Sequence, residues 1–99
     1  MSPATVAVLR ALAEGARYGF DVMDSTGLAS GTVYPILGRL ERRALVRARW
    51  EDPKLPRAEG RPPRKYYSIT PEGREALRVG IERLRQLTGD ARPVPEMGG

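Results

Sequence analysis

Apolar side chains recur every three to four residues along four stretches of the chain, and between the third and fourth stretches the period falls to two. The first stretch begins with Ser2-Pro3, a capping hydroxyl followed by a proline whose missing N–H costs nothing at the first helical position. It predicts a helix over about residues 3–15, ended by a glycine. The second stretch predicts a short helix that opens at Tyr18-Gly19 and ends at Thr26-Gly27.

The third stretch predicts a helix with two distinct faces. At about 100° per residue, the core-facing sector is expected to hold Val33, Ile36, Leu37, Leu40 and Ala44. The opposite sector is small near its start and cationic further along, and holds Gly31, Pro35, Gly38, Arg39 and Arg42. If Ser30 caps this helix, Pro35 removes an intrahelical hydrogen bond, whereas if Thr32 caps it, the proline falls in the first turn and costs little. The pattern leaves both caps open.

Two strands are expected after this helix. Residues 45–51 alternate, with Val46, Ala48 and Trp50 on one side, and residues 65–69 alternate as well. Between them, residues 52–64 hold four of the chain's nine prolines. This composition predicts a stiff, extended loop that is longer than a usual hairpin turn.

Thr70-Pro71 repeats the arrangement of a cap followed by proline and predicts a last helix over about residues 71–88. Its apolar stripe and the residues beside it are Leu77, Ile81, Leu84 and Thr88, flanked by Ala76, Gly80 and Leu87. Because the stripe is broader than one packing partner needs, we expect it to cover its own domain and also a second copy of the chain. Residues 89–99 are rich in Pro and Gly and poor in apolar residues, which predicts a disordered tail after a domain of residues 1–88.

The order helix, helix, helix, strand, loop, strand, helix is a mainly α (α+β) arrangement typical of a winged helix-turn-helix. In that fold a three-helix core carries a two-stranded hairpin, the wing, and here also a C-terminal dimerisation helix. The charge distribution supports DNA as a partner. Residues 39–65 hold ten Lys/Arg against four Asp/Glu, whereas the whole chain has a net charge of only +5. A cationic excess confined to one segment indicates a phosphate-binding surface.

Composition excludes several classes of site. With 99 residues the chain makes one domain, and with no cysteine and no histidine it offers no disulfide, no thiolate metal site and no Ser/His catalytic arrangement. The acids of the basic segment lie among arginines without forming an evident pair, so we expect no enzyme, no cofactor and no metal. No apolar run approaches the roughly 20 residues that span a membrane. The N-terminus reads as a helix and not as an export signal, so a cytoplasmic protein is expected.

The aromatic residues are expected mainly as packing groups. Tyr18 and Phe20 are predicted to lie in the core, with the Tyr18 hydroxyl also a candidate for contacting phosphate. Tyr66 and Tyr67 are predicted to pack on the second strand. For Trp50 a core or strand-edge position is favoured, and the alternative is that it lines a small-molecule pocket at a subunit interface. Arg47 and Arg49, on the outer side of the first strand, are predicted to be solvated.

Three motifs now stand in a recognisable order. They are Tyr18-Gly19-Phe20, then Ser30-Gly31-Thr32-Val33-Tyr34-Pro35-Ile36-Leu37 with Arg39-Leu40-Glu41, and finally Gly60-Arg61-Pro62-Pro63-Arg64-Lys65-Tyr66-Tyr67 through Thr70-Pro71-Glu72-Gly73. Over roughly residues 5–85 the chain resembles the PadR family of bacterial transcriptional regulators. The triplet Tyr34-Pro35-Ile36 and the group Lys65-Tyr66-Tyr67 are the most specific parts of the resemblance.

The resemblance implies a homodimeric repressor that places the third helix in the major groove of a palindromic operator and a basic wing on the flanking backbone. The expected DNA-binding residues are Tyr18, Ser30, Gly31, Thr32, Tyr34, Pro35, Arg39, Arg42, Arg61, Arg64 and Lys65. Longer relatives carry a further helical region, and without it we expect dimerisation to depend on the first and last helices. The expected dimerisation residues are Val8, Leu12, Leu77, Ile81, Leu84 and Leu87.

Two alternatives stay open at this point. The same fold can serve as a protein-interaction module that uses its exposed helix to bind a protein, although the basic wing favours DNA. A small-molecule effector also stays open as a partner.

Overall fold

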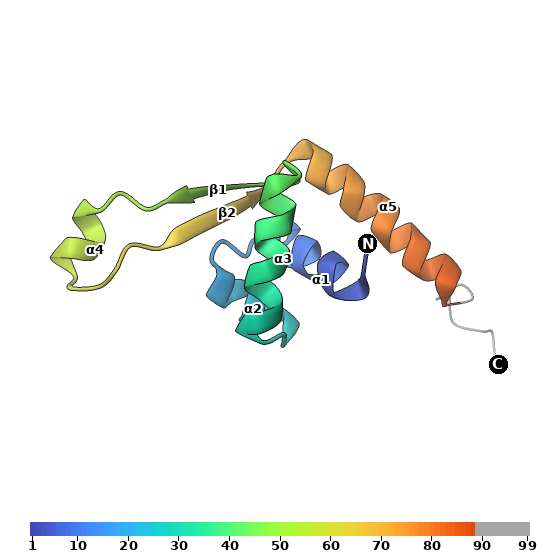
Figure 1. Ribbon diagram of the computed structural model, residues 1–99, viewed down its shortest axis with the longest axis horizontal. Coiled ribbons are helices and arrows are strands. Elements are labelled where there is room, and N and C mark those ends of the chain that lie inside the picture. Colours follow the sequence, from blue (N-terminus) through green and yellow to red (C-terminus); the bar gives the residue numbers. More distant parts are fainter. Residues whose placement is uncertain (89–99) are drawn as a thin grey trace.

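The computed structural model describes residues 1–88, and the predicted tail, residues 89–99, lies outside the described residues. The elements are α1 (Pro3–Ala13), α2 (Gly19–Thr26), α3 (Ser30–Arg42), β1 (Val46–Trp50), α4 (Lys54–Ala58), β2 (Lys65–Ile69) and α5 (Pro71–Leu87). This architecture confirms the predicted mainly α winged helix. Helices α1, α2 and α3 form the body, from which the hairpin and α5 project toward opposite ends (Figure 1). Within residues 1–88, no helix is long and apolar enough to cross a membrane.

The helix boundaries follow local capping. The Ser2 hydroxyl accepts a hydrogen bond from the Thr5 amide at 3.1 Å, and the Thr70 hydroxyl accepts one from the Gly73 amide at 2.9 Å, so both predicted caps are confirmed. Helix α1 ends at Ala13, slightly before the predicted end. Helix α2 ends where Gly27 adopts a left-handed conformation with φ of 75°, which glycine tolerates without strain.

Helix α3 starts earlier than either open alternative. Its N-cap is Ala29, so the expectation that Ser30 or Thr32 caps the helix is wrong, and both residues lie inside it. Pro35 is therefore also inside the helix, where it cannot donate to the carbonyl one turn before it. The predicted placement of Ala44 in the core is also wrong. This residue follows the helix with φ of 60°, and that change of direction leaves it exposed.

The core is one continuous cluster of buried apolar residues. Helix α3 contributes four members as predicted, α1 contributes five, and single residues come from α2, both strands and α5. They are Val6, Val8, Leu9, Ala11, Leu12, Val22, Val33, Ile36, Leu37, Leu40, Val46, Tyr67 and Leu77. The core therefore lies where the three-helix body meets the base of the hairpin and the first half of α5.

The hairpin is antiparallel, with Val46 opposite Ile69 and Trp50 opposite Lys65. Along the other edge of β2, the Tyr67 amide donates to the Arg17 carbonyl at 2.7 Å, so the connection between α1 and α2 runs beside that strand. The predicted extended loop is wrong in one respect, because it contains the short helix α4. Two features explain the turn: Pro53 has a helical φ of −64°, and the Asp52 carboxylate accepts from the Lys54 amide at 2.9 Å.

Candidate nucleic-acid interface

The outer face of α3 is open to solvent and low in relief at its start. Ser30, Gly31, Thr32, Tyr34 and Pro35 are all exposed. Gly31 has no atom within 4 Å of the position that a Cβ would occupy, so nothing covers the backbone there. A helix with small outward residues can approach another surface closely along this part of its length. The exposure of the predicted outward sector is confirmed except at Gly38, which is half-buried, and its DNA contacts stay a prediction.

Further along the same face the surface becomes cationic. Arg39 and Arg42 are exposed, and neither forms an ion pair within residues 1–88. Gly38 lies between them and the low-relief start of the helix, with only the Arg42 guanidinium near it. The order of small residues followed by unpaired cations matches a surface that enters a groove and meets phosphates at its edge.

Tyr34 joins α3 to the start of α2. Its ring lies so close over Gly19 that any side chain at residue 19 would overlap it. Tyr34 nevertheless remains 47% exposed. Gly19 therefore gives the ring a flat backing, while about half of Tyr34 stays open to solvent.

A second cluster stacks a wing cation, Arg64, on the Tyr18 ring, which itself packs against Tyr66. The ring centroids of Tyr18 and Tyr66 lie 4.9 Å apart, and the Arg64 guanidinium carbon lies 5.2 Å from the Tyr18 centroid. The hydrogen bond with Tyr66, together with the nearby Arg64, lowers the pKa of Tyr18. Arg64 is exposed and has no ion-pair partner within the described part of the chain. The stack orients this cation without neutralising it.

Lys65 occupies a different environment on the other side of β2. Its ammonium lies 5.7 Å from the ring centroids of both Trp50 and Tyr67, and 3.4 Å from a Glu41 carboxylate oxygen. Burial raises the pKa of the Tyr67 hydroxyl. Lys65 thus ties the hairpin to α3, and part of its charge is offset by Glu41. Of the two neighbouring wing cations, Arg64 is the less neutralised.

A cleft of about 690 Å³ separates the start of α2 and α3 from the hairpin. Every aromatic residue of the chain except Tyr66 lines it, and the remaining lining residues are Gly19, Asp21, Pro63, Arg64 and Lys65. The prediction of Phe20 as a core residue is wrong, since it is 70% exposed. Helix α2 buries Val22 instead, and a residue two positions earlier points about 200° away on the helix.

Trp50 is also on the surface of this cleft, with 64% of its area exposed. It lies at the last position of β1, opposite Lys65, where the hairpin has already left the core. The strand-edge expectation is therefore confirmed and the core expectation is not. The buried positions of the same strand face are nearer the body, beginning with Val46.

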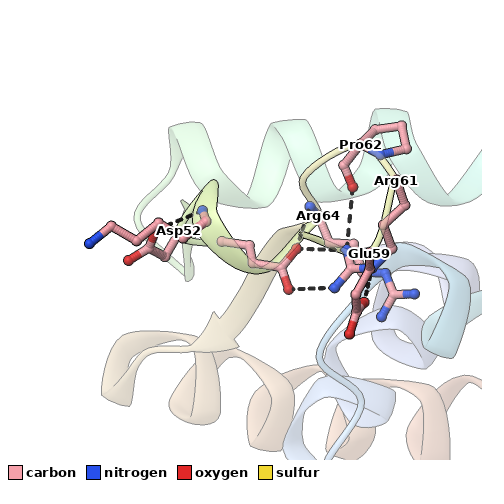
Figure 2. A network of polar contacts seen from close by, with 7 residues as sticks. Asp52, Glu59, Arg61, Pro62 and Arg64 are labelled. Atoms are coloured by element: carbon pink, nitrogen blue, oxygen red, sulfur yellow. Dashed lines mark hydrogen bonds and ion pairs between the residues drawn. The ribbon is translucent and has the colours of Figure 1, made fainter. Parts of the chain in front are cut away.

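Arg61 differs from its expected role as a free wing cation. Its guanidinium donates to both Glu51 carboxylate oxygens, at 2.8 and 2.9 Å, and its Nε donates to Glu59 at 2.7 Å (Figure 2). Only 20% of the Arg61 side chain is exposed. The hydrogen bonds from Arg61, supported by the Arg64 amide, lower the pKa of Glu51 to about 2. Because two carboxylates already hold this guanidinium, Arg61 is not available to a phosphate as the sequence suggested.

Other wing cations take its place at the surface. Lys54 and Arg57 of α4 are exposed and unpaired within residues 1–88. The sequence pattern did not single them out, because a loop without expected helical structure gave no reason to separate outward cations from inward ones. Arg47 and Arg49 are exposed on β1, as predicted. In the described residues no group of three or more Asp or Glu side chains could hold a metal ion.

The predicted dimerisation residues fall into two groups. Val8, Leu12 and Leu77 are buried in the core of their own chain, so their assignment to a dimer surface is wrong. They belong to one buried cluster with residues of α2, α3 and both strands, whereas α5 approaches α1 on the side of Val6, which would lie 3.0 Å from a Cβ added at Gly80. Toward the end of α5 the remaining residues are less covered: Ile81 and Leu84 are half-buried and Leu87 is 75% exposed.

Comparisons with solved structures show which proteins share this fold. A PadR family transcriptional regulator from Eggerthella lenta DSM 2243 is 30% identical and has a TM-score of 0.71, with 86% of this chain and 74% of that chain covered. A PadR family regulator from Clostridium difficile R20291 is 22% identical with a TM-score of 0.73, and the match covers 89% and 93% of the two chains. BpsR from Bordetella bronchiseptica is 22% identical with a TM-score of 0.72, but this match covers 90% of this chain and only 59% of that one.

No match was found among curated protein sequences. The family profile of the transcriptional regulator PadR-like family, however, matches residues 8–79, which include α2, α3, the whole hairpin and the first half of α5. The matched region therefore contains both the exposed face of α3 and the wing, and the chain belongs to the PadR-like family of transcriptional regulators.

Proposed function

We propose that the protein is a sequence-specific DNA-binding repressor that acts as a homodimer on a palindromic operator. Helix α3 enters the major groove, and the wing lies along the flanking backbone. The observation that carries this proposal is the outer face of α3, on which exposed small residues are followed by two arginines that form no ion pair within residues 1–88. Small residues permit close approach to base edges, and arginines at the end of the helix reach phosphates.

The wing supports the same proposal through its position and charge. Arg64 is stacked on Tyr18 beside the body, and Lys54 and Arg57 lie further out on α4. These cations are exposed and unpaired within residues 1–88, and they extend the cationic surface away from α3. The hairpin that carries them projects from the body (Figure 1). Contacts of this kind position a protein on a duplex without reading its sequence.

Homodimerisation is proposed through the second half of α5. This half projects away from the body (Figure 1), and on it Leu84 is half-buried while Leu87 is 75% exposed. Two copies related by a twofold axis would bury these side chains and present two α3 helices to one duplex. An operator with two inverted half-sites follows from that symmetry.

The direct test is DNA binding over a salt series. Fluorescence anisotropy with the promoter of the protein's own gene should show affinity falling about 10³–10⁵-fold between 50 and 200 mM salt, as expected for roughly 6–10 phosphate contacts. Scrambled DNA of the same length is the control. A flat salt response, or equal affinity for both duplexes, would refute specific regulation.

Two substitutions separate base reading from phosphate contact. Tyr34→Ala should relax the preference for the operator over scrambled DNA, whereas Arg64→Ala should weaken both complexes alike and reduce the salt slope. Arg78→Ala is the matched control, because Arg78 lies on α5, away from the wing, and pairs with Glu75 at 2.6 Å. Identical effects of Tyr34→Ala and Arg64→Ala would contradict the assigned roles. Repression itself is tested by a promoter–reporter fusion, whose output should rise when the gene is deleted.

A small-molecule effector is part of the proposal for two reasons, the cleft and one protein of the same fold, BpsR. The solved BpsR structure concerns regulation of DNA binding by 6-hydroxynicotinic acid. In the present chain the sole tryptophan, Trp50, lines the cleft between α3 and the hairpin. Quenching of its fluorescence by an effector, together with release of DNA, would support this part, and compounds that release DNA without changing Trp50 emission would contradict it.

A further inference from the structure

Glu51 is a buried carboxylate at the neck of the wing, where β1 ends and the tip begins. Only 7% of the residue is exposed. Its two oxygens accept from the Arg61 guanidinium at 2.8 and 2.9 Å, and one of them also accepts from the Arg64 amide at 3.1 Å. Its own amide donates to the Arg64 carbonyl at 2.8 Å, one step beyond the β1–β2 ladder. One side chain therefore binds both the returning strand and the tip.

The tip depends on these contacts because it has little apolar packing of its own. Across residues 52–64, only Pro56 is buried. The Pro56 carbonyl accepts from the Arg61 amide at 2.9 Å, so α4 is linked to Arg61. The Arg61 guanidinium in turn links α4 to Glu51. We call this set of contacts the wing clasp: Glu51 with Arg61 and the Arg64 backbone. Without it, ordering the tip on a partner would cost conformational entropy.

The wing clasp also decides which cations face outward. It holds Arg61 inward, with 20% of its side chain exposed, and leaves Lys54, Arg57 and Arg64 exposed. A preordered tip presents these three cations together, which lowers the entropic cost of binding a phosphate backbone.

We propose that Glu51 is a positioning residue for DNA binding, which strengthens binding although it carries a negative charge. The inference rests on the proposed function, because it assumes that the outward cations of the tip meet phosphates. It predicts a change in DNA affinity that is opposite to the usual effect of removing an acid. Removing an acid from a DNA-binding surface normally strengthens binding, since the net positive charge rises. At residue 51 the same change should weaken binding.

The test compares two isosteric substitutions that alter the net charge equally and touch the same guanidinium. Glu51→Gln should bind the operator more weakly at 0.15 M salt, by roughly fivefold for each phosphate that the tip no longer reaches, and with a smaller salt slope. Glu59→Gln is the matched control. Glu59 is 52% exposed on its side chain and contacts only the Arg61 Nε, so this variant should bind as tightly as the wild type or more tightly.

Two further measurements separate positioning from a general loss of structure. Hydroxyl-radical footprints of Glu51→Gln should keep protection at the operator centre and lose it at the flanks, whereas an unfolded protein loses both. Hydrogen exchange of the Arg64 amide should accelerate in Glu51→Gln and not in Glu59→Gln, since this amide donates to Glu51. Arg61→Lys keeps the charge but cannot reproduce the two parallel hydrogen bonds, and it should weaken flank protection as well.

The outcomes are distinguishable. If Glu51→Gln binds more tightly, as Glu59→Gln is expected to, the released Arg61 acts as an ordinary phosphate ligand and the positioning role is overturned. If Arg64 exchange accelerates but affinity and flank protection stay at the wild-type level, the wing clasp exists but does not serve DNA binding, and the inference fails while the proposed function stands. If the wild type shows no sequence-specific binding, the proposed function fails first.

Discussion

Gly73 allows a test of how closely α5 packs on the body. It is buried in the first turn of the helix, and its amide donates to the Thr70 hydroxyl at 2.9 Å. A Cβ at residue 73 would collide with the Leu45 carbonyl oxygen and lie 2.8 Å from Ile69 Cγ1. The Leu45 carbonyl also accepts from the Thr70 amide and hydroxyl, at 3.1 and 3.0 Å. The obstacle is therefore backbone, which cannot move by a change of rotamer.

The expected magnitude of Gly73→Ala combines opposing effects. Helix propensity favours alanine by about 1 kcal/mol. Overpacking against a fixed backbone costs about 1–3 kcal/mol, and disturbing the hydrogen bonds to Leu45 costs about 0.5–1.5 kcal/mol each. We expect a net destabilisation of about 1–5 kcal/mol. For a domain of this size each 1 kcal/mol lowers Tm by roughly 4–8 °C.

Gly38→Ala is the matched control, since an added Cβ there meets only the Arg42 guanidinium at 3.5 Å, an ordinary contact. This variant should gain about 0.5–1 kcal/mol from propensity and unfold at a higher temperature. The assay is thermal unfolding followed by far-ultraviolet circular dichroism at one protein concentration, because the proposed dimerisation would make Tm depend on concentration. A Gly73→Ala variant as stable as the wild type would refute the packing argument. Gly38→Ala should also bind DNA more weakly despite its higher stability, since the methyl group lies on the face proposed to enter the groove.

Two further predictions concern the dimer and the wing. Leu87→Asp should convert the proposed dimer to monomer in sedimentation experiments. The helical signal should not fall, because the Leu87 side chain is 75% exposed in the single chain. The control is Gln86→Asp, one residue earlier, which should leave the proposed dimer intact. Dimers that persist in Leu87→Asp would exclude this end of α5 as the interface. The wing clasp should open in acid: the pKa of Glu51 is lowered from 4.5 to about 2, so its contribution is complete above pH 4.5 and is lost as the pH falls toward 2. Hydrogen exchange of the Arg64 amide, corrected for the intrinsic pH dependence of exchange, measures this, and protection that does not change across that interval would contradict the linkage.

Local patterns were enough to predict the element order, apart from the short helix α4, and most boundaries. The Ser2 and Thr70 caps depend on a hydroxyl and the next few amides, so they are readable from a few adjacent residues. The core face of α3 follows from helical periodicity, and the outward exposure of Arg39 and Arg42 follows from the same rotation of about 100° per residue. The N-cap of α3 was harder to predict from the sequence, because Ser30 and Thr32 both have suitable side chains. The chain conformation around Ala29 decides which position starts the helix.

By itself the sequence determined the winged-helix architecture, the family and the segment that carries the positive charge. Only the tertiary structure decided which of the predicted core, interface and DNA-binding residues are buried, ion-paired or exposed. Val8 and Leu12 look like an interface stripe until the packing of α1 within its own chain buries them, and Phe20 looks like core until Val22 takes the buried position on α2. Arg61 is indistinguishable from Arg64 along the chain, and it is a contact ten residues away, from Glu51, that turns it inward. Burial and ion pairing depend on neighbours distant in sequence, and periodicity and composition contain no record of those neighbours.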